Sequence, residues 1–363
     1  MTDHDSGASR RELSVSARDT NMDPNRPLRV VAMGGGTGLS TLLKGLKGYV
    51  SAGNASNPPA QGRGIEELCA VVTVTDDGGS SGRLRKDFNV LPPGDIRNCI
   101  AALSEDEALL SRLFQHRFQA GAGLNGHSFG NLFLTALTAI TGDFAEAVRQ
   151  SSVILATTGH IYPSTIADVQ LEAVMADGSR VLGETNITGS TGRITQIHLL
   201  PPDAKPLPET LAAIAAAHLI SIGPGSLYTS LVPNLLVHGI PEAVAASSAV
   251  KVFVCNLMTE ANESLGLTAA DHIRVLNSHA GTRIFDYALL NRTPASVELK
   301  LKYAQERASQ IVADIEEIEA LGVKAILGDY LDEVDGVARH ATDRVTRDLL
   351  QLAAKAMPSR AKA

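Results

Sequence analysis

The feature that most constrains this chain of 363 residues is a short apolar run that ends in a glycine-rich turn and leads into a helix. Residues 28–33 run into Gly-Gly-Gly-Thr-Gly at 34–38, and residues 39–46 carry apolar side chains at helical spacing. A second buried strand is expected at 68–74, after a surface loop at 51–64. Two parallel strands joined through a helix form a βαβ unit, so an α/β fold is predicted.

The same pattern returns in the second half of the chain, where apolar runs at 218–222 and 251–256 end in polar residues. Between the halves, Asp177-Gly178 separates two β-type runs and predicts a hairpin within a small β insertion at about 166–205. Further elements are expected as helices at 95–103, 105–118 and 132–141 and as strands at 296–301 and 323–327. The prediction is a Rossmann-like, mostly parallel sheet with flanking helices, this β insertion and a C-terminal α/β extension.

The expected domain boundaries follow from composition. Residues 1–26 are polar, mixed in charge and poor in large apolar side chains, so they cannot bury enough surface to offset the entropy of ordering. We therefore expect a disordered tail at 1–26, one α/β domain over 27–350 and a flexible C-terminus at 351–363.

Composition excludes several classes of protein. The 32 Lys and Arg against 39 Asp and Glu give a net charge of −7, which argues against binding of duplex nucleic acid through many phosphate contacts. No apolar stretch approaches the roughly 18 residues of a membrane span, and no signal peptide is recognisable. Cys69, Cys99 and Cys255 stand singly, so neither disulfides nor a zinc site is predicted, and a cytoplasmic location is expected.

The first glycine turn is a candidate phosphate site. Gly35, Gly36 and Gly38, with Thr37, would let backbone N–H groups approach a phosphate at the amino end of the following helix. Leu39 stands where the last glycine of a dinucleotide fingerprint would fall, and no Gly-Lys-Ser/Thr of a P-loop follows. A bare strand-to-helix turn is the alternative interpretation.

The segment 75–85 is the richest of these segments in side chains that can bind a ligand. Asp76 and Asp77 leave a predicted strand, where carboxylates can bind ribose hydroxyls or a cation such as Mg²⁺. Three further side chains that can bind phosphate follow them, namely Ser80, Ser81 and Arg83. The alternative is a surface loop closed by an ion pair between arginine and aspartate.

Two further polar segments precede predicted helices. In Pro-Pro-Gly-Asp-Ile-Arg-Asn at 92–98, Asp95 and Asn98 can contact a ligand, or Asp95 can cap the helix. The string Gly-His-Ser-Phe-Gly at 126–130 matches a hydrolase nucleophile elbow, but a buried strand does not lead into it. We therefore expect His127, Ser128 and Asn131 either as hydrogen-bond donors at the site or as caps of the helix from residue 132.

The later strands end in similar signals. Gly223, Gly225 and Ser226 follow an apolar run and precede hydroxyl side chains, as in the first glycine turn, and are therefore candidate ligand-binding residues. The alternative is that this turn has only a structural role. After the next strand, Asn256, Thr259, Glu260 and Asn262 can reach a sugar or a base edge, or can cap a helix. Arg339, taken alone, would be read as part of a surface ion pair.

Six segments, taken in order, resemble the bacterial gluconeogenesis factor family over about residues 28–345. They are 34–40, 75–85, 92–98, 126–131, 223–230 and 255–260. The resemblance implies the fold of 2-phospho-L-lactate transferase and binding of UDP-N-acetylglucosamine. It also implies a cytoplasmic role in cell shape and wall precursor supply during gluconeogenic growth. The matching ligand positions are Gly35, Gly36, Thr37, Gly38, Asp76, Asp77, Ser80, Ser81, Arg83 and Arg339. The tail before Leu28 and the loop at 51–64 are longer than is usual in the family.

Two hypotheses of different class remain. The first is a regulator that binds UDP-N-acetylglucosamine or a related nucleotide without turnover and acts on a protein partner in amino-sugar metabolism; it requires no cofactor. The second is a transferase in which Asp76 or Asp77 holds Mg²⁺ across a diphosphate. A nicotinamide-dependent oxidoreductase is a weaker third option, because the last glycine of the fingerprint is missing. A homo-oligomer is compatible with each of these.

Overall fold

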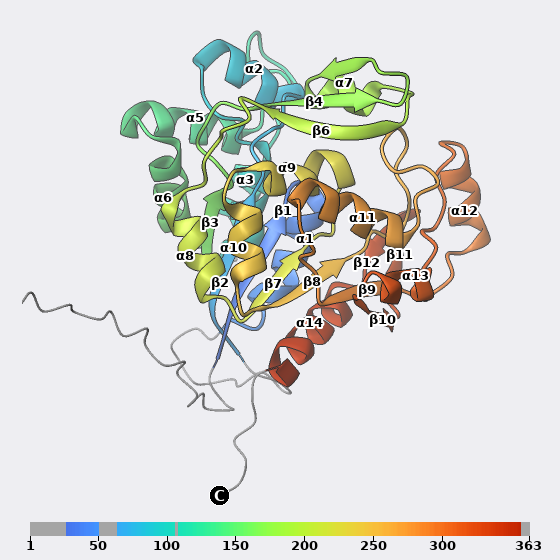
Figure 1. Cartoon of the computed structure of the whole chain (residues 1–363). Coiled ribbons are helices and arrows are strands. Elements are labelled where there is room, and N and C mark those ends of the chain that lie inside the picture. Colours follow the sequence, from blue (N-terminus) through green and yellow to red (C-terminus); the bar gives the residue numbers. More distant parts are fainter. Residues whose placement is uncertain (1–26, 51–63, 106–107, 357–363) are drawn as a thin grey trace, which may run out of the picture.

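The computed structural model describes residues 27–50, 64–105 and 108–356. A seven-stranded, all-parallel sheet crosses the molecule in the order β10–β9–β8–β7–β1–β2–β3 (Figure 1). Its strands are β1 (Leu28–Gly34), β2 (Ile65–Val72), β3 (His160–Pro163), β7 (Leu219–Ile222), β8 (Val250–Val254), β9 (Tyr287–Asn291) and β10 (Lys324–Gly328). The predicted α/β fold with a mostly parallel sheet is confirmed.

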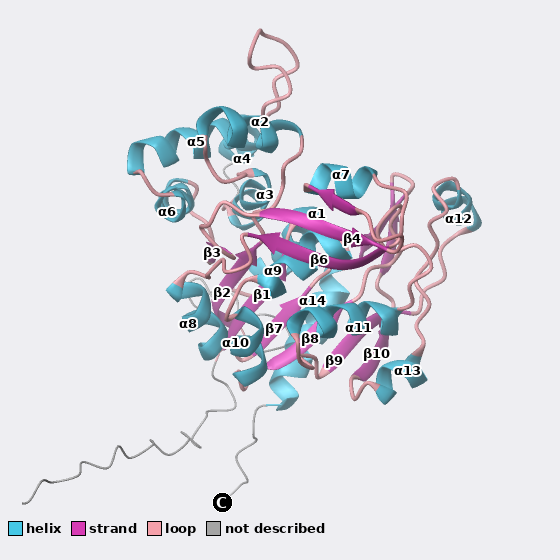
Figure 2. Ribbon diagram, turned by 45° about the horizontal axis from the view of Figure 1, so that its top comes forward, coloured by secondary structure: helices cyan, strands magenta, loops and turns pink. Residues whose placement is uncertain are grey.

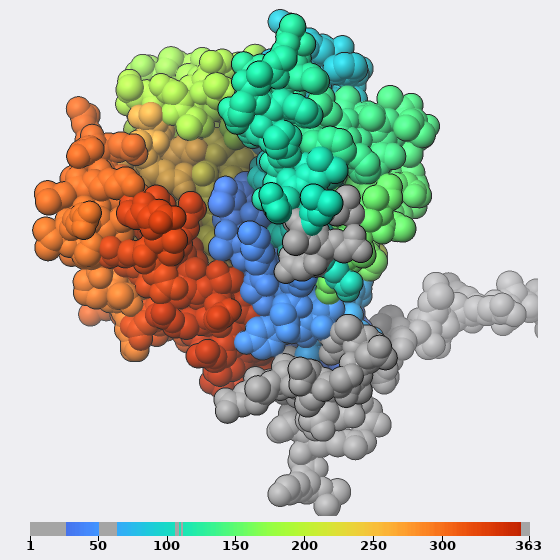
Figure 3. All heavy atoms as spheres, turned by 180° about the vertical axis from the view of Figure 1, so that it is seen from behind, coloured from blue at the N-terminus to red at the C-terminus, as the bar shows by residue number. Residues whose placement is uncertain are grey.

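Helices cover both faces of this sheet, as expected for strands that are apolar on both sides. One face carries α1 (Gly36–Lys47), α3 (Gly94–Leu103) and α14 (Thr342–Ala356), and Figure 3 shows α1 (blue) and α14 (red) side by side. The other face carries α8 (Pro208–Ala216), α9 (Val232–Leu236), α10 (Ile240–Ala246) and α11 (Ala269–Ala280) (Figure 1). The core therefore lies on both sides of β1 and β7.

The local sequence explains the first unit. All side chains of β1 except Arg29 are buried, because β1 is a central strand with helices on both faces. In α1 the buried Leu39, Leu42, Leu43 and Leu46 fall at i, i+3, i+4 and i+7, which forms one apolar stripe against the sheet.

Additional elements lie above the carboxyl ends of the strands (Figures 1 and 2). They are α2 (Gly79–Phe88), α4 (Ala108–Gln115), α5 (Phe129–Thr141), α6 (Phe144–Ile154), and the antiparallel sheet of β4 (Gln170–Met175), β5 (Arg180–Leu182) and β6 (Ile194–Leu200) with α7 (Glu184–Gly189). The β4–β5 hairpin turns at Asp177-Gly178, so the predicted β insertion is confirmed.

The C-terminal extension consists of α12 (Val297–Ala304), α13 (Ile315–Ala320), the hairpin β11 (Leu331–Val334)–β12 (Val337–His340) and α14. This hairpin rather than a helix follows β10, and α14 continues to Ala356, past the expected domain end at residue 350. The predicted disordered tail at 1–26 and most of the predicted loop at 51–64 lie outside the described residues, as do residues 357–363 of the predicted flexible C-terminus.

The predicted strand at 296–301 is wrong, because these residues begin α12. The alternation of Val297, Leu299 and Leu301 has the period of a strand, but only Leu299 is buried. The Ser296 side chain accepts a hydrogen bond from the Leu299 N–H (3.1 Å) and thereby caps the helix. A serine N-cap thus outweighs the β-type alternation.

Of the two interpretations of Asp95, the structure does not show the helix cap. α3 begins at Gly94 with Pro93 as its N-cap residue, so Asp95 lies inside the first helical turn. There its carboxylate is directed at the turn after β1 rather than at its own helix.

Among the described residues, none of the helices is long and apolar enough to cross a membrane.

Candidate functional site

The order of the strands creates a crevice at one point of the sheet. β1 lies between β2 and β7, so the chain leaves β1 toward one edge of the sheet, while after β7 it proceeds toward β8 and the other edge. In open α/β sheets such a reversal separates the two following loops and forms a ligand crevice at the carboxyl ends of the strands. A cavity of about 320 Å³ lies at this position. Predicted site residues that line it are Gly35, Gly36, Thr37, Gly38, Gly225, Ser226, Asn256, Thr259, Glu260 and Arg339.

The amino end of α1 forms one wall of this switch-point cavity. Its N-cap residue, Gly35, has no side chain, and the N–H groups of Thr37 and Gly38 have no acceptor within the helix. A Cβ on Gly38 would lie 2.3 Å from the carbonyl oxygen of Pro224, so only glycine lets the two turns pack this closely. Asp95 accepts a hydrogen bond from the Gly36 N–H, while Thr37 and Gly38 face the cavity with N–H groups at a helix amino end, which attracts anions.

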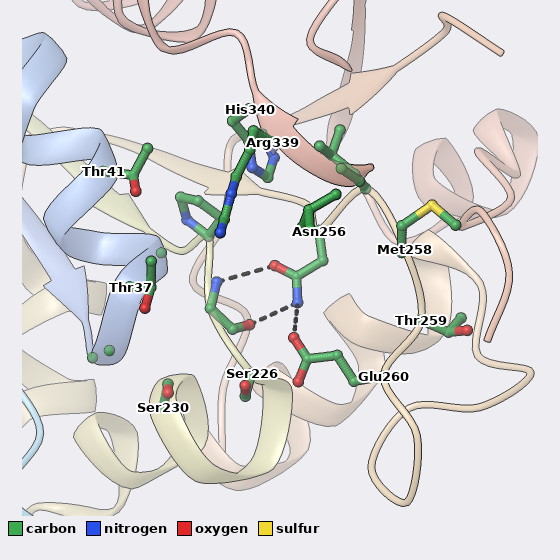
Figure 4. A pocket seen from close by; sticks show the side chains of 18 of the residues that line it. Thr37, Thr41, Ser226, Ser230, Asn256, Met258, Thr259, Glu260, Arg339 and His340 are labelled. Atoms are coloured by element: carbon green, nitrogen blue, oxygen red, sulfur yellow. Dashed lines mark hydrogen bonds between the residues drawn. The ribbon is translucent and has the colours of Figure 1, made fainter. Parts of the chain in front are cut away.

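Arg339 extends from β12 into the same cavity. Figure 4 shows its side chain reaching between Thr37 and Asn256. Within the described part of the chain, its guanidinium has neither a hydrogen bond nor an ion pair with another side chain. The ion-pair interpretation of Arg339 taken alone is therefore not what the structure shows, and this cation can bind an anion seated at the start of α1.

The turn after β7 is fastened to the end of β8. The Asn256 amide oxygen accepts from the Gly225 N–H (3.0 Å), and its Nδ2 donates to the Gly225 carbonyl (2.8 Å) (Figure 4). The same Nδ2 also lies 3.4 Å from Oε1 of Glu260. Asn256 lines the cavity, but its amide is used to position these neighbours.

Two glutamates lie behind and beside this turn. Glu263 accepts from the Tyr228 N–H (3.2 Å) and the Thr229 hydroxyl (2.8 Å), and so holds the start of η1 (Leu227–Leu231), the π-helical turn before α9. Burial and the nearby Glu260 raise the pKa of Glu263 to about 7. The Glu263 carboxylate therefore occupies the amino end of η1.

His340 completes the wall beside Arg339. Its Nε2 lies 3.0 Å from the Cys255 carbonyl oxygen, and burial lowers its pKa to about 4. The imidazole is therefore neutral near pH 7, with Nε2–H donating to the carbonyl and Nδ1 left as an acceptor.

The other predicted residues form a neighbouring polar cluster above α3. Asp76 accepts from the Gly78 N–H (2.9 Å), and Asp77 accepts from the N–H (2.8 Å) and hydroxyl (2.6 Å) of Thr185, which ties its loop to the β insertion. Burial, and secondarily Asp76, raises the pKa of Asp95 to about 7. Asp95 also lies beneath the first turn, because a Cβ on Gly35 would be 2.7 Å from its Oδ2. It thus connects the cavity to this cluster.

A carboxylate that sequence reasoning missed belongs to this cluster. Glu184, at the start of α7, has its pKa raised to about 9 by burial first and then by Asp76, Asp95 and Asp77. These acids are close enough to repel one another, so a cation between them would relieve the repulsion. Over the described ranges, however, no three acidic, histidine or cysteine side chains already stand in metal-binding geometry. The donor types fit Mg²⁺, with Asp76 and Asp95 as the residues that would hold it.

His127 and Asn131 are placed by Ser80. The Ser80 hydroxyl lies 2.9 Å from His127 Nδ1 and accepts from Asn131 Nδ2 at 3.1 Å, and all three side chains are buried. Ser128 is fully buried and caps α5 through the Asn131 N–H (3.3 Å), so the capping interpretation holds for Ser128. The buried position also explains why the nucleophile-elbow string carries no exposed nucleophile.

The remaining predicted residues lie outside the cavity wall. Arg83 is exposed and donates to the Asn125 carbonyl (2.8 Å). Ser81 packs near Asp76 beside Gly94, and Asn98 lies half-buried on α3. Gly223, with a positive φ of 88°, makes the bend that leads into the Pro224 turn.

Sequence reasoning singled out only part of the cavity wall. Thr41 follows Thr37 by one helical turn, a spacing that could have indicated it. His340 adjoins Arg339, but its burial depends on long-range packing. Tyr303, Met258, Val337 and Ala338 add apolar surface to the wall, and no local signal distinguishes them from core residues.

Fold and cavity together define a class: a doubly wound α/β protein with a cavity at its topological switch point, lined by a helix amino end and an arginine. The comparisons with known proteins narrow this class. The family model described as 2-phospho-L-lactate transferase CofD matches residues 30–331. The chain belongs to this family, and within it to the gluconeogenesis factors, as its relatives show.

A gluconeogenesis factor from Bacillus subtilis is 46% identical over 324 residues, which cover 89% of this chain and 98% of that protein. A gluconeogenesis factor from Halalkalibacterium halodurans is 46% identical over 322 residues, covering 89% of this chain and 95% of that protein. A crystal structure of a protein from Bacillus halodurans superimposes with a TM-score of 0.84 at 46% identity, covering 90% of this chain and all of that one.

Proposed function

We propose that this protein binds UDP-N-acetylglucosamine, or a closely related nucleotide, in the switch-point cavity and acts in the cytoplasm as a regulator. The ligand-bound protein would act on a protein partner in amino-sugar metabolism. Through this partner it would affect cell shape and wall precursor supply under gluconeogenic growth. The observation that carries the ligand class is the Arg339 guanidinium, which has no ion-pair partner among the described residues and shares the cavity with Thr37 and Gly38 at the amino end of α1. A cation opposite a helix amino end suits a diphosphate. The sugar and the cellular role rest on the family resemblance.

A second candidate is an Mg²⁺-dependent transferase of phosphorus-containing groups, in line with the name of the matching family model. The acidic cluster of Asp76, Asp95 and Glu184 beside the cavity favours it. Bound Mg²⁺ would neutralise charge on a diphosphate, while Arg339 and α1 would orient that diphosphate. Among the described residues that line the cavity, Glu260 and His340 do not hydrogen-bond to each other as a carboxylate–histidine pair that could activate an acceptor hydroxyl, which favours the regulator.

Calorimetric titration with UDP-N-acetylglucosamine, with and without Mg²⁺, followed by chromatography of the recovered nucleotide, tests both. Binding with intact ligand supports the regulator, and release of UMP, UDP or a sugar phosphate supports the transferase. Arg339→Ala should weaken binding about 10- to 100-fold, since a hydrogen bond to a charged group contributes about 1.5 to 3 kcal/mol. Arg347→Ala, which removes an exposed arginine of α14, is the matched control and should bind as wild type does.

If wild type and Arg339→Ala give the same titration curve, the ligand does not lie across the switch-point cavity. If wild type binds no nucleotide at all, the proposed function is wrong.

A further inference from the structure

Glu260 is a cavity side chain whose hydrogen-bonding capacity the described residues do not fill. A carboxylate can accept about four hydrogen bonds. Asn256 Nδ2 approaches its Oε1 at 3.4 Å, and the Ser226 hydroxyl approaches the same carboxylate. The backbone N–H of Glu260 is bound to the Ser264 hydroxyl (3.0 Å), which fixes the residue in the wall. The carboxylate is therefore held in place by its neighbours and retains free lone pairs at the cavity.

The position of Glu260 separates it from the anion-binding wall. Figure 4 shows Glu260 below Asn256, across the cavity from Thr37 and away from Arg339. A carboxylate there would repel a phosphate and attract hydrogen-bond donors. The cavity is thus divided between an anion-binding side at α1 and β12 and an acceptor side at the segment after β8.

Apolar residues adjoin both sides of the cavity. Leu257 and Met258 adjoin Glu260 in sequence, Val337 and Ala338 precede Arg339 on β12, and the Tyr303 hydroxyl accepts from the Ala338 N–H (3.2 Å). A flat base needs such a surface, whereas a diphosphate does not. In a nucleoside diphosphate the ribose connects these two parts, so its hydroxyls would fall between the apolar surface and α1, beside Glu260.

We propose that Glu260 is the specificity residue that recognises the ribose hydroxyls of the ligand, so that the cavity selects ribonucleoside diphosphates over their 2′-deoxy forms. This inference rests on the proposed function and identifies which part of the ligand faces which wall. A deoxyribose would leave the half-buried carboxylate short of a donor, and sites built to bind a hydroxyl discriminate strongly against ligands that lack it.

The test compares UDP with 2′-deoxy-UDP by calorimetry, on wild type, Glu260→Gln and Glu260→Asp. Wild type should bind UDP about 10- to 100-fold more tightly than 2′-deoxy-UDP. In Glu260→Gln the ratio should fall toward one through a loss of UDP affinity, while 2′-deoxy-UDP binds about as in wild type. Glu260→Asp keeps the charge with a shorter reach and should give an intermediate ratio. Glu298→Gln, an exposed glutamate of α12, is the matched control and should keep the wild-type ratio.

The outcomes separate the two proposals. Wild type that binds UDP and 2′-deoxy-UDP equally, or Glu260→Gln that keeps the wild-type ratio, overturns the inference and leaves the proposed function standing. If Glu260→Gln loses affinity only for UDP-N-acetylglucosamine and keeps the ratio, the carboxylate binds the second sugar and the ribose assignment is wrong. If wild type binds neither UDP nor UDP-N-acetylglucosamine, the proposed function fails, and the inference fails with it. Melting temperatures of all variants show whether a loss of affinity reflects unfolding.

Discussion

At the scale of single residues, the cavity depends on the closeness of two turns. Gly38 at the start of α1 faces the Pro224 carbonyl after β7, and a Cβ at 2.3 Å would overlap with backbone that cannot rotate away. Gly38→Ala should therefore destabilise the protein by about 1 to 3 kcal/mol, as overpacking does, and weaken ligand binding as well. Urea unfolding and calorimetry would measure the two effects.

Gly48 provides the matched control for this substitution. It closes α1 with an ordinary φ of −61°, and its Cβ would meet the Gly45 carbonyl oxygen at 3.5 Å. Gly48→Ala should leave binding unchanged and be neutral or slightly stabilising, because alanine lowers the entropy of the unfolded chain. Equal stability of the two alanine variants would show that the turns can separate without loss.

The half-buried acid Glu184 should make stability depend on pH. Its pKa is raised from 4.5 to about 9, mainly by burial, so between these values the folded state holds a proton that the unfolded state has released. The contribution of Glu184 to the free energy of unfolding is then greatest below pH 4.5 and falls as pH rises toward 9. Glu184→Gln resembles the protonated form, so its stability relative to wild type should increase from pH 5 to pH 9.

Urea unfolding at pH 5, 7 and 9 measures this trend, with the exposed Glu66→Gln as a control that should run parallel to wild type. A constant difference between Glu184→Gln and wild type at all three pH values would mean that Glu184 is ionised throughout. Added Mg²⁺ that flattens the wild-type profile would support a cation at the acidic cluster.

At the scale of elements, the strands and turns at the switch point could be predicted because their signals are local. The apolar runs before Gly35 and Gly223 are continuous, as buried parallel strands require, and each ends in glycine. Sequence reasoning placed both turns at the carboxyl edge of one sheet. It could not show that Asp76 and His127 belong to a separate cluster, because that separation depends on how α2 and α5 pack above the sheet.

The position of Arg339 in the cavity could not be predicted from its neighbours in sequence. It reaches the cavity because β11 pairs with β12 in an antiparallel hairpin, and the hairpin is held over the sheet by contacts far away in sequence. One of them joins His340 to Cys255. No periodicity near residue 339 encodes this placement, so only the family resemblance pointed to Arg339.

In α12, the N-cap Ser296 favours a helix although the apolar residues alternate with the period of a strand. The Ser296 N–H (2.7 Å) and hydroxyl (2.6 Å) both donate to Glu333 of β11, while the hydroxyl oxygen accepts from Leu299. Ser296→Ala should lower the free energy of unfolding by about 0.5 to 2 kcal/mol, the usual range for loss of an N-cap. Chemical denaturation measures the change.

Ser278→Ala on α11 is a suitable comparison, since an exposed helical serine gains helix propensity on this change. It should be neutral or slightly stabilising. If Ser296→Ala were equally harmless, the two bonds of the Ser296 hydroxyl, to Glu333 and from Leu299, would contribute little to the stability of α12.

At the scale of the whole molecule, the cavity gathers segments from nearly the full described length of the chain, from Gly35 to His340. A ligand that contacts the turns after β1, β7 and β8 and the β11–β12 hairpin bridges both halves of the sheet. Because such a ligand binds only when these segments are folded together, its binding free energy adds to the stability of the entire fold.

This coupling of ligand binding to folding predicts how much the ligand stabilises the protein. UDP at 100 times its dissociation constant should stabilise wild type by about 2.7 kcal/mol, which raises the melting temperature by several degrees. Arg339→Ala at the same UDP concentration should gain much less, because its affinity is lower, and N-acetylglucosamine alone should have no effect on either protein. A thermal scan that showed equal shifts for wild type and Arg339→Ala would place the nucleotide away from the point where the sheet reverses direction, since only there does one ligand contact both halves.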